Sequence, residues 1–335
     1  MRDFAKRYRW ELTVAGMVVL AAVWATLLSP YYLNLGQLFY ASGSFIFTGI
    51  LGFGLLVIVV TGEIDLSIPS TLAVCTVLLA KASALAVPLW IAVPLIFVVA
   101  GLLGALNGIL VARLKLPALA VTLGTMGAYR GLAFIIGSEV GYTGFSDSYL
   151  WLGTAAVGRA QIPVQLLLFV LVAVVITVLM HFSTFGRRCY AVGNNMHAVA
   201  YSGISVVKVK VGAYVVGGLA AALGAWIFIG QYGSARGDNA NGVILGVITS
   251  VVLGGVDING GSGTVAGVTL SILFLWTLRN GMGLANITGE VQELIIGVLL
   301  IASILISNLS RAGLSRGARQ RRKSMVVDPA RDDPS

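Results

Sequence analysis

The chain has 335 residues, of which 58% are hydrophobic and only 10% are charged. A soluble domain carries about 25% charged residues, so this composition excludes a water-soluble globular protein. The formal net charge is +9, and much of it falls in a polar C-terminal stretch, where anionic lipid headgroups are a better match than nucleic acid.

Apolar segments of about 20 residues recur along the sequence, and each is long enough to cross a membrane as a helix. Because lipid offers the backbone no hydrogen-bond partner, such segments are expected to be helical. We therefore predict an all-α, polytopic membrane protein of about ten transmembrane helices with an internal repeat. In chain order the predicted spans are 11–29, 42–61, 67–81, 88–112, 117–137, 164–182, 210–231, 242–256, 264–279 and 291–309.

The distribution of Lys and Arg predicts how these helices are oriented. Seventeen of the 22 Lys and Arg residues fall on one face of the predicted topology. Because positive residues are enriched on the cytoplasmic side, both termini are expected there. The predicted parts are a cytoplasmic N-terminus (1–10), a transmembrane domain (11–309) and a basic, disordered cytoplasmic tail (310–335).

A short stretch of sequence occurs twice. "VVTGEIDLSIPSTLAV" at 59–74 and "VVLGGVDINGGSGTVA" at 251–266 share a Val-Val pair, a glycine and an apolar-Asp-apolar triplet. We interpret them as an internal duplication whose two copies run parallel in the predicted topology. With one span more or fewer between them they would be inverted, as transporter repeats often are. Asp65 and Asp257 are expected to accept hydrogen bonds from the free N–H groups of the following helix. Alternatively, these broken helix ends form part of a gate beside a solute path, and the two roles are compatible.

The connection 183–209 is longer than the other predicted cytoplasmic connections. Within it, Asn195 is expected to cap a short helix (196–202), with Gly203 just after its C-terminus. One interpretation is a polar linker with a single helical turn. The other is a docking element for a cytosolic partner, because the segment is basic and carries apolar side chains.

Signatures of catalysis and nucleotide binding are missing from the sequence. "GGSGT" at 260–264 has the glycines of a phosphate loop but no lysine, and His181 and His197 stand apart from other metal-binding residues. Cys75 and Cys189 are expected to be packing residues. We predict no catalytic residue, no metal and no cofactor of its own.

Ionisable residues inside the membrane usually mark ion-coupled transporters. Here the carboxylates fall at the ends of predicted spans, and Arg130 alone is placed well inside one. Arg130 could snorkel, pair with a carbonyl or line a polar path. Because a proton or sodium relay finds little support, the energy for transport is expected from an ATPase on another chain, with a secondary carrier or a membrane scaffold as alternatives.

Four fragments in order carry a resemblance to a known family. They are "GEIDLS" at 62–67, "LNGILVARLKLPALAVTLGTMGAYRGLA" at 106–133, "VGNNMHAVAYSGI" at 192–204, and "VVLGGVDINGGSGTVAG" with the later "LRNGMGL". Residues 40 to 308 resemble the integral permease subunits of bacterial ABC sugar importers, the ribose, xylose, rhamnose and autoinducer-2 group. The stretch "QYGSARGDNANG" at 231–242 is most similar to the autoinducer-2 and rhamnose types.

This chain also departs from the family pattern. Glu63 stands where family members usually have glycine, and Pro69 is unusual nearby. His197 and Ala200 stand where members often carry a Glu and an Arg in the docking loop. Contact with an ATPase would therefore depend more on shape than on ion pairs, or this chain would be the weaker partner of a permease heterodimer.

The resemblance implies a set of partners in the bacterial plasma (inner) membrane. These are a cytosolic ABC ATPase that binds the ATP, a second permease subunit (identical or homologous), a periplasmic or extracellular solute-binding protein and membrane lipid, with no nucleic acid. The expected ATPase-docking residues are Gly193, Asn195, His197, Ala198, Tyr201, Ser202 and Gly203.

The function implied is that of a permease subunit forming the translocation path for a sugar or sugar-like solute, with rhamnose and autoinducer-2 as the candidates. A secondary carrier of a small polar solute is the alternative. Since a separate binding protein would select the solute, the path needs no tight charged site, and a neutral polyol or sugar suits it. The candidate pathway or gate residues are Glu63, Asp65, Asn107, Thr122, Arg130 and Asp257.

Overall fold

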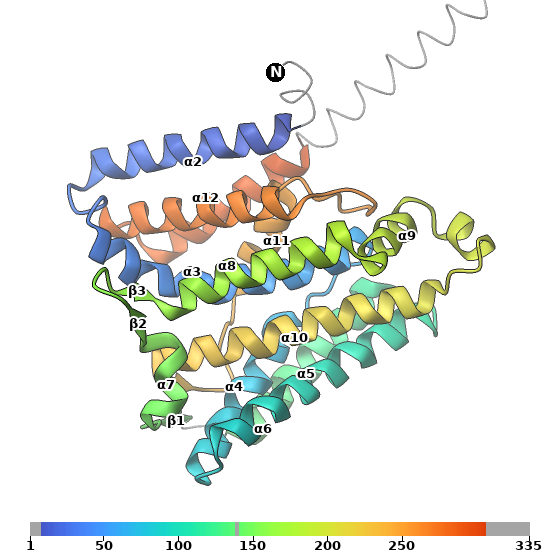
Figure 1. The fold of residues 1–335 in the computed structure, drawn as a ribbon, viewed down its shortest axis with the longest axis horizontal. Helices are drawn as coiled ribbons and strands as arrows, with labels where there is room; N and C mark the ends of the chain where they lie inside the picture. Colours follow the sequence, from blue (N-terminus) through green and yellow to red (C-terminus); the bar gives the residue numbers. More distant parts are fainter. Residues whose placement is uncertain (1–7, 138–140, 306–335) are drawn as a thin grey trace, which may run out of the picture.

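The computed structural model describes residues 8–137 and 141–305. Within them the chain forms a bundle of helices, most of which run side by side along one axis (Figure 1). The helices are α2 (Arg9–Leu28), α3 (Leu35–Val60), α4 (Ile68–Ala84), α5 (Leu89–Ala112), α6 (Ala118–Gly137), α7 (Asp147–Thr154), α8 (Val164–Thr177) with the π-helical turn η1 (Val178–Phe182), α9 (Thr184–Tyr201), α10 (Val206–Tyr232), α11 (Val243–Leu253) and α12 (Val265–Leu284). A last helical stretch covers 289–305 and is called the final helix here. The predicted tail (310–335) lies outside the described residues.

The all-α, multi-pass prediction is confirmed. Among the described residues, seven helices are long and apolar enough to cross a membrane, and α4 and α11 are shorter apolar helices. With the final helix, each of the ten predicted spans coincides with a helix. The strands found are two residues long: β1 (Tyr142–Thr143) pairs with β4 (Ser234–Ala235), and β2 (Ala156–Val157) pairs with β3 (Ile162–Pro163).

The two ends of the bundle differ. One end carries α9 and the two repeated turns, residues 61–67 and 254–264, and we call it the inner end. The opposite end carries α7 and the short strands, and we call it the outer end (Figure 1). The start of α2 lies at the inner end, because the indole nitrogen of Trp10 donates to the carbonyl of Leu253 at 2.9 Å.

The core is centred on α3 and on close helix contacts. Every residue from Gly49 to Val60 of α3 is buried. Helices α5 and α10 approach so closely that a β-carbon on Gly104 would overlap the carbonyl oxygen of Tyr214. Small residues allow this approach, which matters in lipid because no hydrophobic force drives helices together there.

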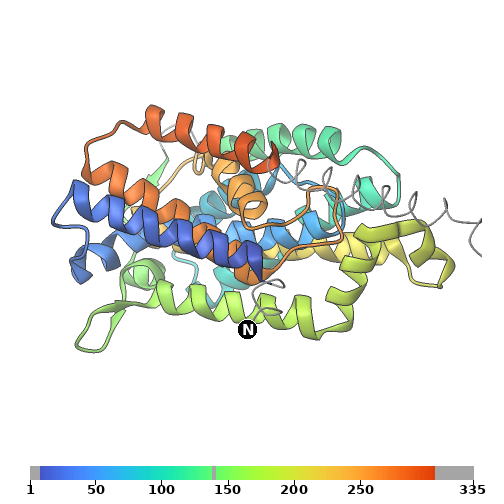
Figure 2. The same cartoon turned by 90° about the horizontal axis from the view of Figure 1, so that it is seen from above.

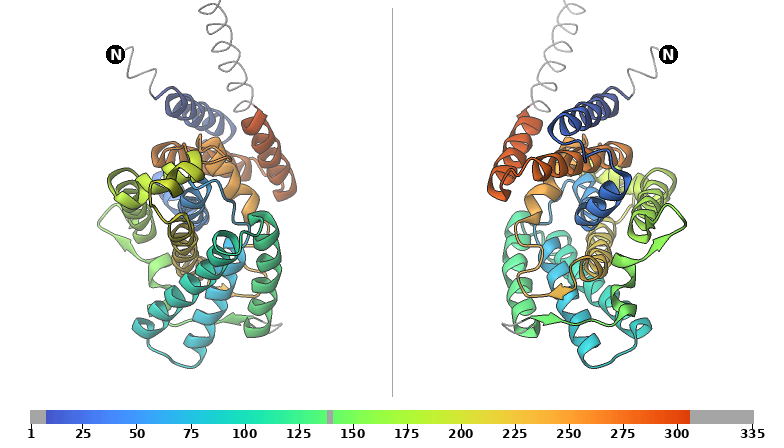
Figure 3. Two further views of the ribbon diagram at one scale, coloured as in Figure 1. Left: turned by 90° about the vertical axis from the view of Figure 1, so that its right-hand side faces the viewer. Right: turned by 90° about the vertical axis from the view of Figure 1, so that its left-hand side faces the viewer.

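The outward-facing side chains of the long helices are apolar. On α8, for example, Val170, Leu171 and Val174 are each more than half exposed. Exposed apolar side chains on helices of this length suit a hydrocarbon environment. Figure 2 shows the final helix (red) and α6 (green) along one side of the molecule and α8 along the opposite side, and the end views of Figure 3 agree.

Two predicted elements differ from the structure. The eighth span (242–256) is helical only from Val243 to Leu253, which is 11 residues or roughly 16 Å at 1.5 Å per residue. The rest of that crossing is the non-helical segment 233–242, whose polar sequence had placed it outside the membrane. The connection 183–209 is not a linker with one helical turn, because α9 fills most of it and bends at Asn195.

Candidate functional site

The two repeated turns touch one another at the inner end. The amide of Gly261 donates to the carbonyl of Val60 at 2.9 Å. Gly62 has a left-handed φ of +82°, and a β-carbon there would lie 3.2 Å from the carbonyl oxygen of Asn259. Both copies therefore follow helices that arrive at the same end, in the parallel arrangement expected for the duplication.

Helix α9 is seated directly on this pair of turns. A β-carbon on Gly193 would overlap both the carbonyl oxygen of Val60 and the amide nitrogen of Gly261. The side-chain amide of Asn194 donates to Gly261 at 3.0 Å, and the hydroxyl of Tyr190 donates to Gly263 at 2.8 Å. Because α9 contacts both copies of the repeat, a displacement of α9 must move them.

Sequence reasoning selected Gly193 but missed Asn194 and Tyr190. The partners of these side chains are backbone groups about 70 positions away, and no residue type marks them. A glycine within a helix is a weak signal for close backbone approach, and it was the one signal available at this contact.

The second half of α9 forms the capped short helix that the sequence predicted. Asn195 leaves the helical conformation, and its side-chain oxygen accepts from the amide of Ala198 at 3.0 Å. Gly203 follows with φ of +78°. This half projects from the bundle (Figure 1), and the side chain of Tyr201 is 94% exposed. The other predicted docking residues in it are also exposed, namely Asn195, His197, Ala198, Ser202 and Gly203.

Four of the predicted pathway residues gather at the first repeated turn: Glu63, Asp65, Asn107 and Thr122. The buried carboxylate of Asp65 accepts from the amide and the hydroxyl of Ser67, each at 2.7 Å. Asn107 on α5 donates to the Ser67 hydroxyl at 2.8 Å, and Tyr129 on α6 donates to Asn107 at 3.1 Å. Burial raises the pKa of the Asp65 carboxyl, although the hydrogen bonds from Ser67 act in the opposite direction. This chain of bonds ties the start of α4 to the last turns of α5 and to the middle of α6.

The remaining members of this group are Thr122 and Glu63. The hydroxyl of Thr122 donates to Ala118 at 2.8 Å and lies 3.5 Å from the carbonyl oxygen of Ile64. Glu63 forms an ion pair with Lys210 at the start of α10, with both side chains largely buried. Glu63 therefore has a partner of opposite charge, which its position in the sequence did not reveal.

The helix-capping role expected of the two aspartates is corrected by the structure. Asp65 bonds to Ser67, which precedes the first residue of α4. Asp257 accepts from the amide of Asn259 at 2.9 Å, whereas α12 is capped by Thr264, which accepts from Gly267 at 3.0 Å. Both aspartates thus shape the turn that leads to the helix, because a short carboxylate reaches the amide two residues on.

Arg130 lies elsewhere, beside the non-helical segment 233–242. Its guanidinium donates to the carbonyls of Gly237 at 2.8 Å and Asn239 at 2.7 Å. Asn239 in turn donates to Thr76, the central residue of α4, at 3.1 Å. Residues 237–239 of the segment therefore lie about midway through the bundle, where unpaired carbonyls are costly. Of the three alternatives for Arg130, the structure shows pairing with carbonyls.

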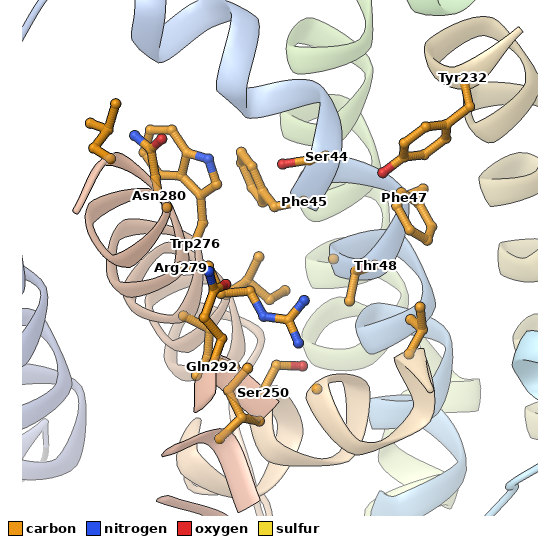
Figure 4. A pocket seen from close by; sticks show the side chains of 18 of the residues that line it. Ser44, Phe45, Phe47, Thr48, Tyr232, Ser250, Trp276, Arg279, Asn280 and Gln292 are labelled. Carbon is orange, nitrogen blue, oxygen red and sulfur yellow. The ribbon is translucent and has the colours of Figure 1, made fainter. Parts of the chain in front are cut away.

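A cavity of about 560 Å³ lies between α3, α11, α12 and the final helix (Figure 4). It extends from Gln37 and Leu284, at the outer ends of α3 and α12, to Ser250 near the inner end of α11. None of the six predicted pathway residues lines it. Its principal polar and aromatic residues are Ser44, Phe45, Trp276, Arg279, Asn280 and Gln292.

The described residues also bear on metal binding and thiol chemistry. Within residues 8–137 and 141–305, no three His, Cys, Asp or Glu side chains are grouped so that they could hold a metal ion. Cys75 and Cys189 are both free and buried. What the described part of the chain offers is a polar cavity, a polar network and a contact element at the inner end.

Comparisons with known proteins place this geometry in context. A family model described as branched-chain amino acid transport system / permease component matches residues 37–304. The autoinducer 2 import system permease protein LsrD of Photorhabdus temperata is 29% identical over 330 residues, covering 97% of this chain and 99% of the relative. The LsrD proteins of Escherichia coli K12 and Shigella flexneri are each 30% identical over 308 residues, covering 91% of this chain and 93% of theirs. No solved structure matches.

Proposed function

This chain belongs to the permease-component family of branched-chain amino acid transport systems, and we propose that it is the transmembrane subunit of an ABC importer for a sugar-like solute related to autoinducer 2. The chain is a multi-pass membrane protein, and its relatives are import permeases. ATP is bound and hydrolysed by a partner chain, as the family resemblance implies.

The observation that carries the proposal is the seat of α9 on the two repeated turns. Its first half is held by Gly193 and Asn194, and its second half projects with Tyr201 exposed. A helix that is fixed to the membrane domain at one end and free at the other suits contact with a moving partner. Closure of the ATPase would push α9, and α9 would shift both turns.

The orientation follows from charge at the inner end. Arg113 and Lys115 join α5 to α6 there, and Arg187 and Arg188 lie on α9. Because positive residues favour the cytoplasmic side, we place the inner end in the cytoplasm, where an ATPase can reach α9. The outer end then receives solute from a soluble binding protein.

A second permease subunit fits the side of the molecule that carries α6 and the final helix. On α6, Gly124, Gly127 and Gly131 are exposed and have open space around them. Asn241 and Gly242, in the non-helical segment next to α6, are exposed as well. Irregular backbone at membrane depth is not exposed to lipid, and small residues favour close packing of helices. We therefore place the second subunit here.

The solute is proposed from the relatives and from the chemistry of the interior. The relatives are named for autoinducer 2. The interior offers hydroxyls, side-chain amides and aromatic rings, which suit a small, neutral, hydroxyl-rich molecule.

The proposal is tested by Ala198→Glu, which places a charge on the exposed half of α9 away from the core. We expect loss of ATPase co-purification and of ATP-dependent uptake, with the membrane domain still folded. Ala160→Glu, an exposed alanine at the outer end, is the matched control and should leave both unchanged. Retained ATPase binding in Ala198→Glu would contradict the role of α9.

A further inference from the structure

We propose that the cavity between α3, α11, α12 and the final helix is a solute-binding vestibule within the single subunit, open toward the outer end and specific for a neutral, hydroxyl-rich ring. This inference rests on the proposed function and deepens it, because it assigns the solute a site of its own in this chain. Five observations support it: unpartnered donors, facing hydroxyl groups, a partly offset charge, an aromatic wall and an apolar seal.

The cavity holds hydrogen-bond donors that lack partners. Within the described residues, the guanidinium of Arg279 makes no hydrogen bond and no ion pair, although it carries five N–H donors. Figure 4 shows Arg279 extending from α12 toward Thr48 and Ser250. The side-chain nitrogen of Asn280 is buried and also has no partner among the described residues. Since buried donors are nearly always paired, the Asn280 amide calls for an acceptor oxygen, and the guanidinium of Arg279, which is exposed, offers further donors to the same ligand.

Hydroxyl groups face these donors from the opposite wall. Ser44 and Thr48 lie one turn apart on α3 and line the cavity. Ser44 is exposed although its neighbours Gly43 and Phe45 are buried, so its side chain opens into the cavity space. Both walls can therefore exchange hydrogen bonds with a small polar molecule.

The positive charge of Arg279 is partly offset by a carboxylate that does not itself line the cavity. Glu293 on the final helix interacts electrostatically with Arg279. An isolated guanidinium would attract an anion, but the carboxylate of Glu293 repels an anion and so weakens this attraction. A neutral solute is thus favoured over a phosphorylated or carboxylated one.

Aromatic rings form an ordered wall of the cavity. Phe45 and Trp276 lie with ring centroids 5.0 Å apart, inclined at 39°. The indole nitrogen of Trp276 donates to the carbonyl of Ala41 at 3.2 Å, which fixes the ring in place. A rigid, largely apolar surface beside a few polar groups is typical of sites that orient a small ligand.

An apolar seal lies between the cavity and the inner end. Below Ser250, a small space of about 30 Å³ is lined only by apolar residues: Leu55, Val59, Ile64, Ile248, Val251, Val252 and Ile258. Ile64 and Ile258 belong to the two repeated turns, the same turns on which α9 is seated. The vestibule is therefore closed on the inner side in this structure, and moving α9 offers a way to open it.

The test uses the full-length permease in lipid nanodiscs, without ATPase or binding protein. Saturation-transfer NMR would measure binding of three neutral probes, autoinducer 2, D-ribose and L-rhamnose, and of ribose 5-phosphate as the anionic probe. We expect binding of at least one neutral probe, weakened at least tenfold by Arg279→Gln and by Trp276→Leu. Arg159→Gln and Trp90→Leu, exposed residues outside the cavity, are the matched controls.

Any one of three results would overturn the proposal. They are unchanged binding in both cavity variants, no binding of any neutral probe, and a preference for ribose 5-phosphate. If a cavity variant does not fold, Ser44→Cys provides a second measurement, because both native thiols are buried. A membrane-impermeant thiol reagent added at the outer side should modify Ser44→Cys, and the bound probe should slow modification at least threefold. Val59→Cys, in the seal, should not react.

This experiment separates the vestibule from the proposed function. Intact ATP-dependent uptake in Arg279→Gln and Trp276→Leu, with unaltered probe binding, would remove the vestibule and leave the importer assignment standing. Probe binding that depends on Arg279, for a permease with which no ATPase co-purifies from the native host, would support the vestibule and contradict the importer.

Discussion

Gly193 of α9 lies against Val60, the last residue of α3, so closely that a β-carbon on Gly193 would overlap the Val60 carbonyl oxygen. The same β-carbon would overlap the amide nitrogen of Gly261 in the second repeated turn. One glycine thus connects the element proposed to face a cytosolic partner with both copies of the internal duplication. We propose this contact as the basis for coupling an ATPase to the solute path.

The first prediction concerns that glycine. Gly193→Ala should displace α9 from the turns and reduce ATP-dependent uptake by at least tenfold, while ATPase binding through the exposed half of α9 persists. Uptake and co-purification are measured together in proteoliposomes. Gly16→Ala, at a position with open space in α2, is the control and should behave like the wild type. Normal uptake by Gly193→Ala would show that the contact does not transmit movement.

The second prediction concerns the ion pair between Glu63 and Lys210. Lys210→Met should lower the thermal midpoint in detergent, because removing one partner of a buried pair costs about 3–5 kcal/mol. The double variant Glu63→Gly with Lys210→Met should recover most of the loss, since no unpaired charge remains. Arg236→Met breaks a pair whose side chains are 57% and 45% exposed and should change the midpoint little. A double variant as unstable as the single one would contradict the pairing.

The third prediction concerns Asp65. Asp65→Asn should keep near-normal stability, because the amide oxygen can still accept from Ser67 and the buried charge is removed. Asp65→Ala leaves the Ser67 donors unpaired and should cost about 1–3 kcal/mol for each buried group. Thermal unfolding of the two variants side by side checks this order. If Asp65→Asn were the less stable of the two, a charged role for Asp65 would have to replace the structural one.

The fourth prediction concerns Arg130 and the non-helical segment. Arg130→Leu removes the donor from two carbonyls at mid-depth, Gly237 and Asn239, at a cost of about 1–3 kcal/mol each. We expect faster hydrogen exchange in residues 233–242 and a lower thermal midpoint. Arg113→Leu, an exposed arginine at the inner end, serves as the control. Unchanged exchange in Arg130→Leu would indicate that the segment is held by other contacts.

The sequence was sufficient to predict the membrane-spanning helices, because hydrocarbon requires long apolar helical segments and the chain supplies them. It was also sufficient for the capped half of α9, where Asn195 and Gly203 follow local capping rules. Both features depend on residues that are neighbours in the chain, so periodicity and residue type report them.

The cavity could not be predicted in this way. One wall comes from α3, which is far in sequence from α11, α12 and the final helix. In addition, one predicted helix boundary concealed the main charge of the cavity. The ninth span was expected to end at residue 279, which placed Arg279 at the membrane edge. The helix continues to Leu284, so Arg279 joins Arg130 as an ionisable residue within a span. Hydropathy falls at "RNG", and it does not distinguish a helix that ends from one that lines a polar space.

The segment 233–242 was missed for a related reason. Its composition is that of an exposed loop, but Arg130 and Thr76 provide the partners that let it lie at mid-depth. A hydropathy profile scores each residue against lipid, whereas this segment is surrounded by protein. Only the contacts between α4, α6 and the segment reveal its position.

The central claim is that this chain moves solute only with an ATPase attached to α9. The most direct test is purification of the tagged protein from its native host in mild detergent, followed by uptake of autoinducer 2 in proteoliposomes with and without ATP. We predict that an ATPase with a phosphate loop co-elutes and that uptake requires ATP. A preparation without ATPase that still transports the solute, and that stops when an uncoupler is added, would contradict the account and identify a secondary carrier.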